Sequence, residues 1–130
     1  MNIILPKVVI EELKERASKA GTSIVEYLLD ILTRDVDPSV GAKSYIRGAE
    51  ELIEQAREEF MKGDLRQASE KIWSACALAI KAHALARRGM KLESHRDLWM
   101  YKNEIAKELG DWVRITFNWQ ILCIKTSTKT

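Results

Sequence analysis

The chain has 130 residues, which corresponds to one ordinary domain or two very small ones. Hydrophobic residues make up 46% of it, a share that excludes a disordered chain. The formal net charge is +2, which excludes the strongly basic field of a dedicated nucleic-acid coat protein but allows a local basic patch.

The start of the chain predicts a short strand followed by two helices. Residues 2–5, which are apolar from Ile3 to Leu5, predict the strand. Apolar residues at helical spacing predict a first helix over residues 7–20, which a glycine ends. The capping-box pattern of Ser23 and Glu26 begins a second helix, and we expect it to end near Val36.

The rest of the chain is predicted to be helical throughout. Apolar stripes predict one helix over residues 38–62 and another over 65–88. The second of these is rich in alanine and should be the central helix of a bundle. Ser94 caps a further helix that ends at Leu109, and residues 111–124 form a last helix or an irregular segment. The predicted fold class is therefore all-α, an antiparallel helical bundle preceded by a strand–helix–helix segment.

The single predicted strand has a consequence for assembly. A strand leaves its backbone donors and acceptors unpaired unless it meets another strand. The obvious partner is the same segment of a second chain, so we expect a homodimer held by an intermolecular two-stranded ribbon. Residues 37–41 are the plausible linker between this segment, residues 1–36, and the bundle, residues 38–124.

The order of strand, helix, turn and helix over residues 2–36 resembles the ribbon–helix–helix family of dimeric DNA binders. The resemblance implies that ribbon side chains enter the major groove and that the start of the second helix holds a phosphate. The residues concerned here are Asn2, Thr22 and Ser23. Because Asn2 is the one outward polar side chain of the ribbon, we favour a ribbon that only dimerises, with weak or no sequence-specific DNA binding.

Four segments of the longer part resemble the archaeal PaREP family, whose bundle is HEPN-like. They are AEELIEQA at 49–56, GDLRQASEKIW at 63–73, AHALA at 82–86 and SHRDL at 94–98. The resemblance runs from about residue 45 to 112 and implies a dimer. HEPN-like proteins include toxins, RNA-processing enzymes and partners of nucleotidyltransferases. The segment after residue 111 departs from the family pattern, since it contains no His or Glu.

Active HEPN proteins carry an Arg, four to six residues and a His at the dimer interface, and Arg88 and His95 match this spacing. A histidine can act as acid or base on a ribose hydroxyl, and an arginine can hold the phosphate. Arg87 and Arg96 would add nucleic-acid contacts. The alternative is that these arginines are solvated helix ends and that His95 is a cap or a surface residue.

The helix over residues 65–88 is predicted to have two faces of different character. His83 and Arg87 share a mostly apolar face, where a histidine is more often a satisfied core residue than a catalyst. Lys81 and Arg88 share a face with Gln67, Lys71 and Ser74 that the pattern predicts to be solvated.

The sequence does not support a metal site or a cofactor. Cys76 and Cys123 are far apart and have no Cys or His at ligand spacing, so we expect two buried thiols. The longest apolar run, Ala75–Ile80, is far short of the roughly 20 residues that a bilayer requires, so no membrane contact is expected. The default compartment is the cytoplasm.

These patterns lead to one functional hypothesis and two alternatives. The leading hypothesis is a dimeric HEPN-like protein that binds RNA or a nucleotide. The more specific version of this hypothesis is a metal-independent endoribonuclease of toxin or defence type. The first alternative is a non-enzymatic DNA-binding or dimerisation module that uses the N-terminal segment. The second is a helical partner of a nucleotidyltransferase. Whether the protein is an enzyme is left open by the sequence.

Overall fold

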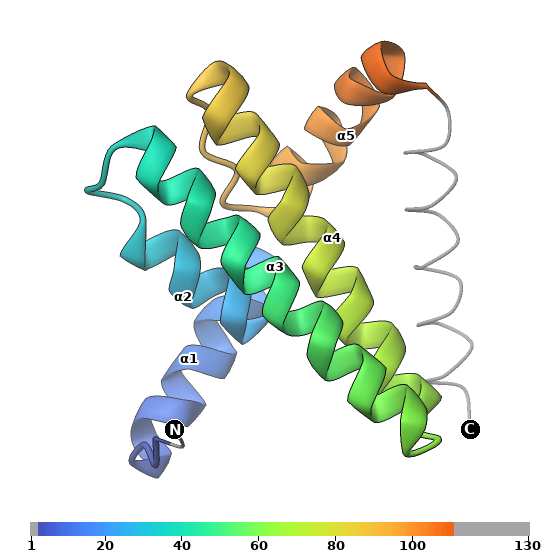
Figure 1. Ribbon diagram of the computed structural model, residues 1–130. Coiled ribbons are helices and arrows are strands. Elements are labelled where there is room, and N and C mark those ends of the chain that lie inside the picture. The colour runs from blue at the N-terminus through green and yellow to red at the C-terminus, as the bar shows by residue number, and fades with distance from the viewer. Residues whose placement is uncertain (1–2, 111–130) are drawn as a thin grey trace.

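The computed structural model describes residues 3–110, and within them the fold is all-α, as predicted (Figure 1). Asn2 and the expected last helix over residues 111–124 lie outside the described residues. No helix of the described part has the length and apolar character needed to cross a bilayer. The five helices are α1 (Lys7–Ala20), α2 (Ile24–Leu32), α3 (Pro38–Met61), α4 (Leu65–Arg88) and α5 (His95–Leu109).

Local sequence signals explain where these helices begin and end. The bounds of α1, α4 and α5 agree with the prediction, and α3 ends one residue earlier than expected. Ser23 Oγ accepts a hydrogen bond from the Glu26 backbone N–H, as in a capping box. The prediction for α2 was wrong by four residues. This helix ends at Leu32, since the Thr33 backbone leaves the helical region with φ −101° and ψ 3°, and the Thr33 hydroxyl donates to the Leu29 carbonyl at 2.6 Å.

The predicted strand at residues 2–5 is not formed in the described residues 3–5, and the strand–helix–helix start is therefore wrong for this chain by itself. Ile3 and Ile4 are 74% and 95% exposed and lead directly into α1. The physical reason is that a strand needs a second strand to satisfy its backbone, and the described part of the chain supplies none.

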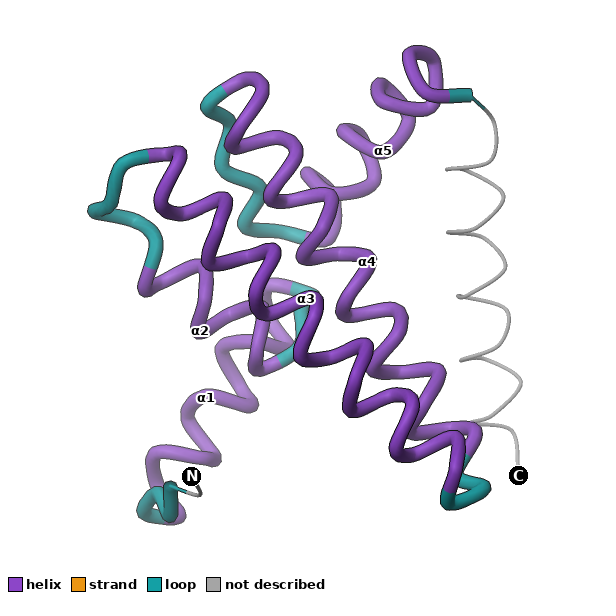
Figure 2. The backbone as a smooth tube through the Cα atoms, in the orientation of Figure 1, coloured by secondary structure: helices purple, strands orange, loops and turns teal. Residues whose placement is uncertain are grey.

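Helices α3 and α4 form a long antiparallel hairpin that dominates the fold (Figure 2). Small residues let the two helices and α2 approach closely. A Cβ atom added at Gly41 would lie 2.8 Å from Leu85 Cδ2, and one added at Gly48 would lie 2.9 Å from Leu29 Cδ1. α4 also packs against α5 and α2, which confirms it as the central helix.

α5 does not continue the antiparallel pattern. Its first residue, His95, lies beside Trp73 in the first half of α4, whereas Glu104 and Glu108 contact Arg88 at the end of α4. α4 and α5 therefore run in the same general direction. The connection over residues 89–94 makes this possible, because an extended segment of that length can return about 20 Å along α4, and Leu92 is buried on the way.

α1 projects from the bundle and packs chiefly on α2 (Figure 1). Its C-terminal end is anchored, since Ala17 is buried and Gly21 abuts His95. The first part of the chain, residues 3–10, which we call the arm, is exposed throughout.

Candidate functional site

Arg88, the first residue of the predicted catalytic pair, is neutralised by two carboxylates. Its guanidinium lies 2.5 Å from a carboxylate oxygen of Glu104 and 2.5 Å from one of Glu108. The same guanidinium lies over the ring of Tyr101, 5.3 Å from the centroid. Arg88 thus ties the ends of α4 and α5 together.

His95, the second residue of that pair, lies between two indole rings. It stacks on Trp73 with 5.9 Å between ring centroids and meets Trp99 edge-on at 5.7 Å. Trp99 Nε1–H donates to His95 Nε2, so this ring nitrogen is occupied as an acceptor. Burial, with a smaller contribution from Lys102, lowers the pKa of His95. The imidazole is therefore held in its neutral form.

Within one chain the structure does not bring Arg88 and His95 together. His95 contacts Trp73, and Arg88 comes fifteen positions after Trp73 in α4, which corresponds to about 22 Å along the helix axis. A shared active site would need a second chain to supply one of the two residues. The catalytic pair stays a prediction about the dimer.

The other predicted nucleic-acid contacts are scattered. Ser23 is used in capping α2, and the Thr22 hydroxyl is buried with no hydrogen-bond partner in the described residues. Arg96 is exposed on the first turn of α5, and Asn2 lies outside the described residues. Arg87 is the exception, because it lines a groove.

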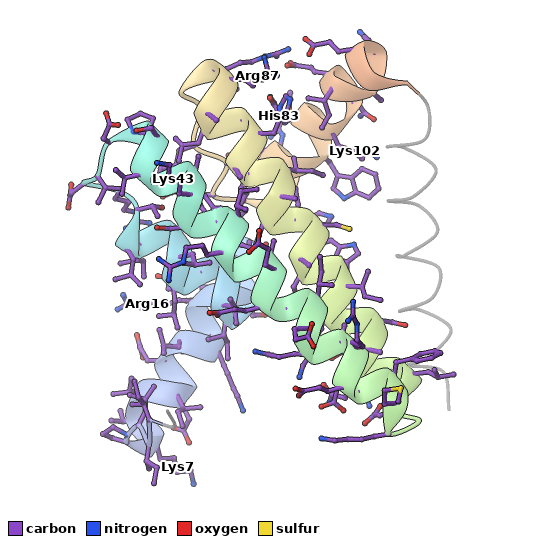
Figure 3. All side chains as sticks on the ribbon, viewed as in Figure 1. Lys7, Arg16, Lys43, His83, Arg87 and Lys102 are labelled. Atoms are coloured by element: carbon purple, nitrogen blue, oxygen red, sulfur yellow. The ribbon has the colours of Figure 1, made fainter. Side chains whose placement is uncertain are left out.

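This groove lies between the first half of α3 and the second half of α4 and has a volume of about 1010 Å³. We call it the α3–α4 groove. Its floor is apolar, and its basic side chains come from both helices; three of them, Lys43, His83 and Arg87, are labelled in Figure 3. The lining residues are Asp37, Pro38, Ser39, Ala42, Lys43, Ile46, Arg47, Ala79, Ala82, His83, Ala86 and Arg87.

The cations of the α3–α4 groove differ from most others in the described chain by having no acidic partner there. Lys43, Arg47 and Arg87 form no ion pair with any described residue. Asp37, the acidic residue of the lining, accepts a hydrogen bond from Ser39. The cations with acidic partners are Lys7, Arg16, Lys19, Arg34, Arg57, Arg66, Lys71, Lys81, Arg88 and Lys91.

His83 was predicted to be a core residue with its hydrogen bonds satisfied. The structure shows a hydrogen-bond partner for it but not full burial. Its Nδ1 lies 2.6 Å from the Tyr101 hydroxyl, which is buried, but the ring is only half-buried and lines the groove. Arg87 was expected to pack beside it and is instead exposed. The reason is that small side chains, including Ala42, Ala79 and Ala82, line this part of the α3–α4 interface and leave open space beside Arg87.

The prediction that Lys81 lies on a solvated face was wrong. Lys81 is 1% exposed, and its Nζ lies 2.8 Å from Asp30 Oδ2 and 3.6 Å from Glu26 Oε2. The Tyr45 hydroxyl donates to Asp30 Oδ1 at 2.5 Å. We call Glu26, Asp30, Tyr45 and Lys81 the buried ionic cluster.

The buried ionic cluster fixes α2 on the α3–α4 hairpin. Burial is the largest cause that raises the pKa of Glu26, against the opposing effect of Lys81. Burial also raises the pKa of Tyr45, so its hydroxyl stays protonated and can donate. Lys91 Nζ adds a hydrogen bond to the Asp30 carbonyl at 2.8 Å. Asp30, Tyr45, Lys81 and Lys91 are joined by hydrogen bonds, and Glu26 Oε2 lies 3.6 Å from Lys81 Nζ but accepts no hydrogen bond from a described group. We interpret the cluster as structural and take the α3–α4 groove as the candidate functional site.

Sequence reasoning missed the groove because Lys43 and Arg47 lie on a different helix from His83 and Arg87. The available signal was the i, i+4 spacing of each pair, which places each on one helix face. Among the described residues, no group of His, Cys, Asp and Glu side chains is arranged to hold a metal ion.

Comparison with known proteins gives one match. The model of a family described as the archaeal PaREP1/PaREP8 family matches residues 44–119, which is more than half of the chain. No curated protein and no solved structure matches.

Proposed function

We propose that this chain, which belongs to the archaeal PaREP1/PaREP8 family, is a dimeric HEPN-like protein that binds RNA or a nucleotide by its phosphate in the α3–α4 groove. One observation carries the proposal. Three cations, Lys43, Arg47 and Arg87, converge on one groove without acidic partners in the described chain, although most other described cations have one.

The chemistry of the groove suits a ligand with an anionic and an apolar part. Arginine and lysine bind phosphate oxygens through charge-assisted hydrogen bonds. Ala42, Ala79 and Ala82 give the groove an apolar lining against which a base can pack. A volume of about 1010 Å³ is at the upper end of the range for small-molecule sites.

The test is a binding titration with adenosine 5′-monophosphate and with a short single-stranded RNA. Arg87→Ala is expected to weaken binding of either ligand about tenfold or more, since it removes a charged hydrogen bond. Binding should also weaken as salt rises. Arg66→Ala is the matched control, because Arg66 pairs with Glu70 away from the groove. Equal affinities of wild type and Arg87→Ala would refute the proposal.

Endoribonuclease activity is the more specific form of this proposal and depends on the dimer. The spacing of Arg88 and His95 supports it, and two chains would have to juxtapose these residues. Cleavage of single-stranded RNA in EDTA by wild-type protein, lost in His95→Gln, is the expected result. Glutamine is the better substitution because the His95 ring packs on Trp73, so alanine would also leave a cavity. No cleavage by the wild type would remove the enzymatic hypothesis and leave a binding protein.

The exposed arm favours a second candidate function, dimerisation or docking of another protein, including a nucleotidyltransferase, by the N-terminal segment. Ile4 is 95% exposed and Val8 69% exposed, an unusual amount of apolar surface on one short segment. Ile4→Glu combined with Val8→Glu should convert a dimer to a monomer of about 15 kDa in sedimentation equilibrium. A wild-type protein that sediments as a monomer would contradict homodimerisation.

A further inference from the structure

We infer that His83 presents its Nε2–H to the α3–α4 groove as a hydrogen-bond donor for a phosphate monoester, and that Tyr101 is the positioning residue that fixes this tautomer. The inference rests on the proposed phosphate-binding role of the groove and names the ligand group and a further residue that recognises it.

The geometry of the His83–Tyr101 pair decides which nitrogen carries the proton. The Tyr101 hydroxyl lies 2.6 Å from His83 Nδ1 and has no other hydrogen-bond partner among the described residues. Tyr101 is 2% exposed, so an O–H that did not donate to Nδ1 would be buried without an acceptor. The hydroxyl therefore donates to Nδ1, which is the acceptor nitrogen of the ring in this arrangement. The ring proton is then on Nε2.

The surroundings of Tyr101 hold its hydroxyl in this role. Burial raises the pKa of Tyr101, which keeps the phenol protonated. The Arg88 guanidinium lies over the ring and is itself held by Glu104 and Glu108. These contacts hold the Tyr101 side chain in place, so its hydroxyl oxygen stays beside His83 Nδ1.

His83 Nε2 belongs to a ring that lines the groove, and it forms no hydrogen bond with a described group. This nitrogen is also not among the buried polar atoms that lack a partner. On the same helix, Arg87 is four residues further on and lies on the same face. An imidazole N–H and a guanidinium on one face, with Lys43 opposite, provide donors for several oxygens of one phosphate.

A phosphate monoester fits these donors better than an internal phosphodiester does. A monoester carries about −1.5 to −2 charges near neutral pH and three terminal oxygens, whereas a diester carries one charge. The groove offers three cations and one fixed neutral donor. The same chemistry is found in a mononucleotide and at the phosphorylated end of an RNA, and the experiment separates these sources.

The first measurement is the tautomer. A ¹⁵N–¹H long-range correlation spectrum of the free protein is expected to show His83 with its proton on Nε2, and Tyr101→Phe is expected to lose this preference. A proton on Nδ1 in the wild type would overturn the inference, because Nε2 would then be an acceptor.

The second measurement is binding, with inorganic phosphate, adenosine 5′-monophosphate, adenosine and a short RNA with and without a 5′-phosphate as probes. We expect His83→Asn to weaken binding of adenosine 5′-monophosphate about tenfold or more. We expect His83→Gln to retain most of it, because the longer amide can place an N–H near the position of Nε2. Adenosine and the unphosphorylated RNA should bind more weakly than their phosphorylated counterparts.

The outcomes separate this inference from the proposed function. Binding that depends on Arg87 but not on His83 would overturn the inference and leave the proposed function standing. Equal binding of phosphorylated and unphosphorylated RNA would overturn the choice of a monoester. No binding of any probe by the wild type would overturn both. Preference of the phosphorylated RNA over adenosine 5′-monophosphate would identify RNA ends as the source of the phosphate.

Discussion

The cations on the two sides of α4 have opposite surroundings. On one side, Lys81 is buried and held by Asp30 and Glu26, which α2 brings over it. On the other side, Arg87 and Lys43 line an open groove without acidic partners in the described chain. Whether a cation on this helix stabilises the fold or remains available to a ligand therefore depends on which element lies over it.

Removing the buried cation should have the largest effect. Lys81→Met leaves Asp30 and Glu26 buried without their cation, and we expect the free energy of unfolding to fall by about 3–5 kcal/mol. Urea denaturation measures this change. Lys71→Met is the matched control, because Lys71 pairs with Glu59 at a partly exposed position of the same helix and should cost about 1 kcal/mol or less. Equal losses in the two variants would show that burial of the pair is unimportant.

A carboxylate placed in the α3–α4 groove should give its cations an acidic partner, as Lys81 has in the buried ionic cluster. Ala86→Glu puts an acid beside Arg87, and we expect affinity for adenosine 5′-monophosphate to fall about tenfold or more through competition for the cations. Its free energy of unfolding should change by less than about 0.5 kcal/mol, because the residue is exposed. Calorimetric titration measures the affinity.

Ala86→Gln is the matched control for this experiment, since it has the same size without the charge. Equal weakening by glutamate and glutamine would mean that the groove recognises shape and not charge.

The smallest predicted effect concerns pH. The pKa of Glu26 is raised in the folded protein, so folding favours its protonated form. The stability that this group contributes is present below its unfolded pKa, near 4.5, and is lost as pH rises through the folded pKa. Glutamine cannot titrate, so Glu26→Gln does not lose this stability as pH rises. We therefore expect the urea midpoint of Glu26→Gln to rise relative to that of the wild type between pH 4.5 and pH 7. A constant difference would contradict the raised pKa.

The helices were predictable because their signals are local. The Ser94 cap, glycine stops and apolar periodicity placed α1, α4 and α5 without error, and the Ser23 cap placed the start of α2. The end of α2 was not predictable in the same way. It depends on Thr33, whose hydroxyl caps the helix and also lies 3.2 Å from the Tyr45 hydroxyl in another helix.

The candidate site was only partly predictable, because charge partners distant in sequence decide it. Arg88 matched a motif spacing, but Glu104 and Glu108 engage it across the helix interface. Lys81 looked solvated because nothing near it in the sequence indicates that Asp30 would be its partner. His83 and Arg87 were correctly placed on one face, yet the contribution of α3 to that face needed the three-dimensional structure.

The attachment of α1 to the bundle, chiefly through α2, also has a kinetic consequence. Segments with little buried surface open locally at low free energy, without unfolding the rest of the protein. Backbone amides in the first turns of α1 should therefore exchange with solvent deuterium much faster than those in the middle of α4, where Ala77 and Leu78 are fully buried. We therefore expect the first turns of α1 to open locally without opening of the α3–α4 hairpin.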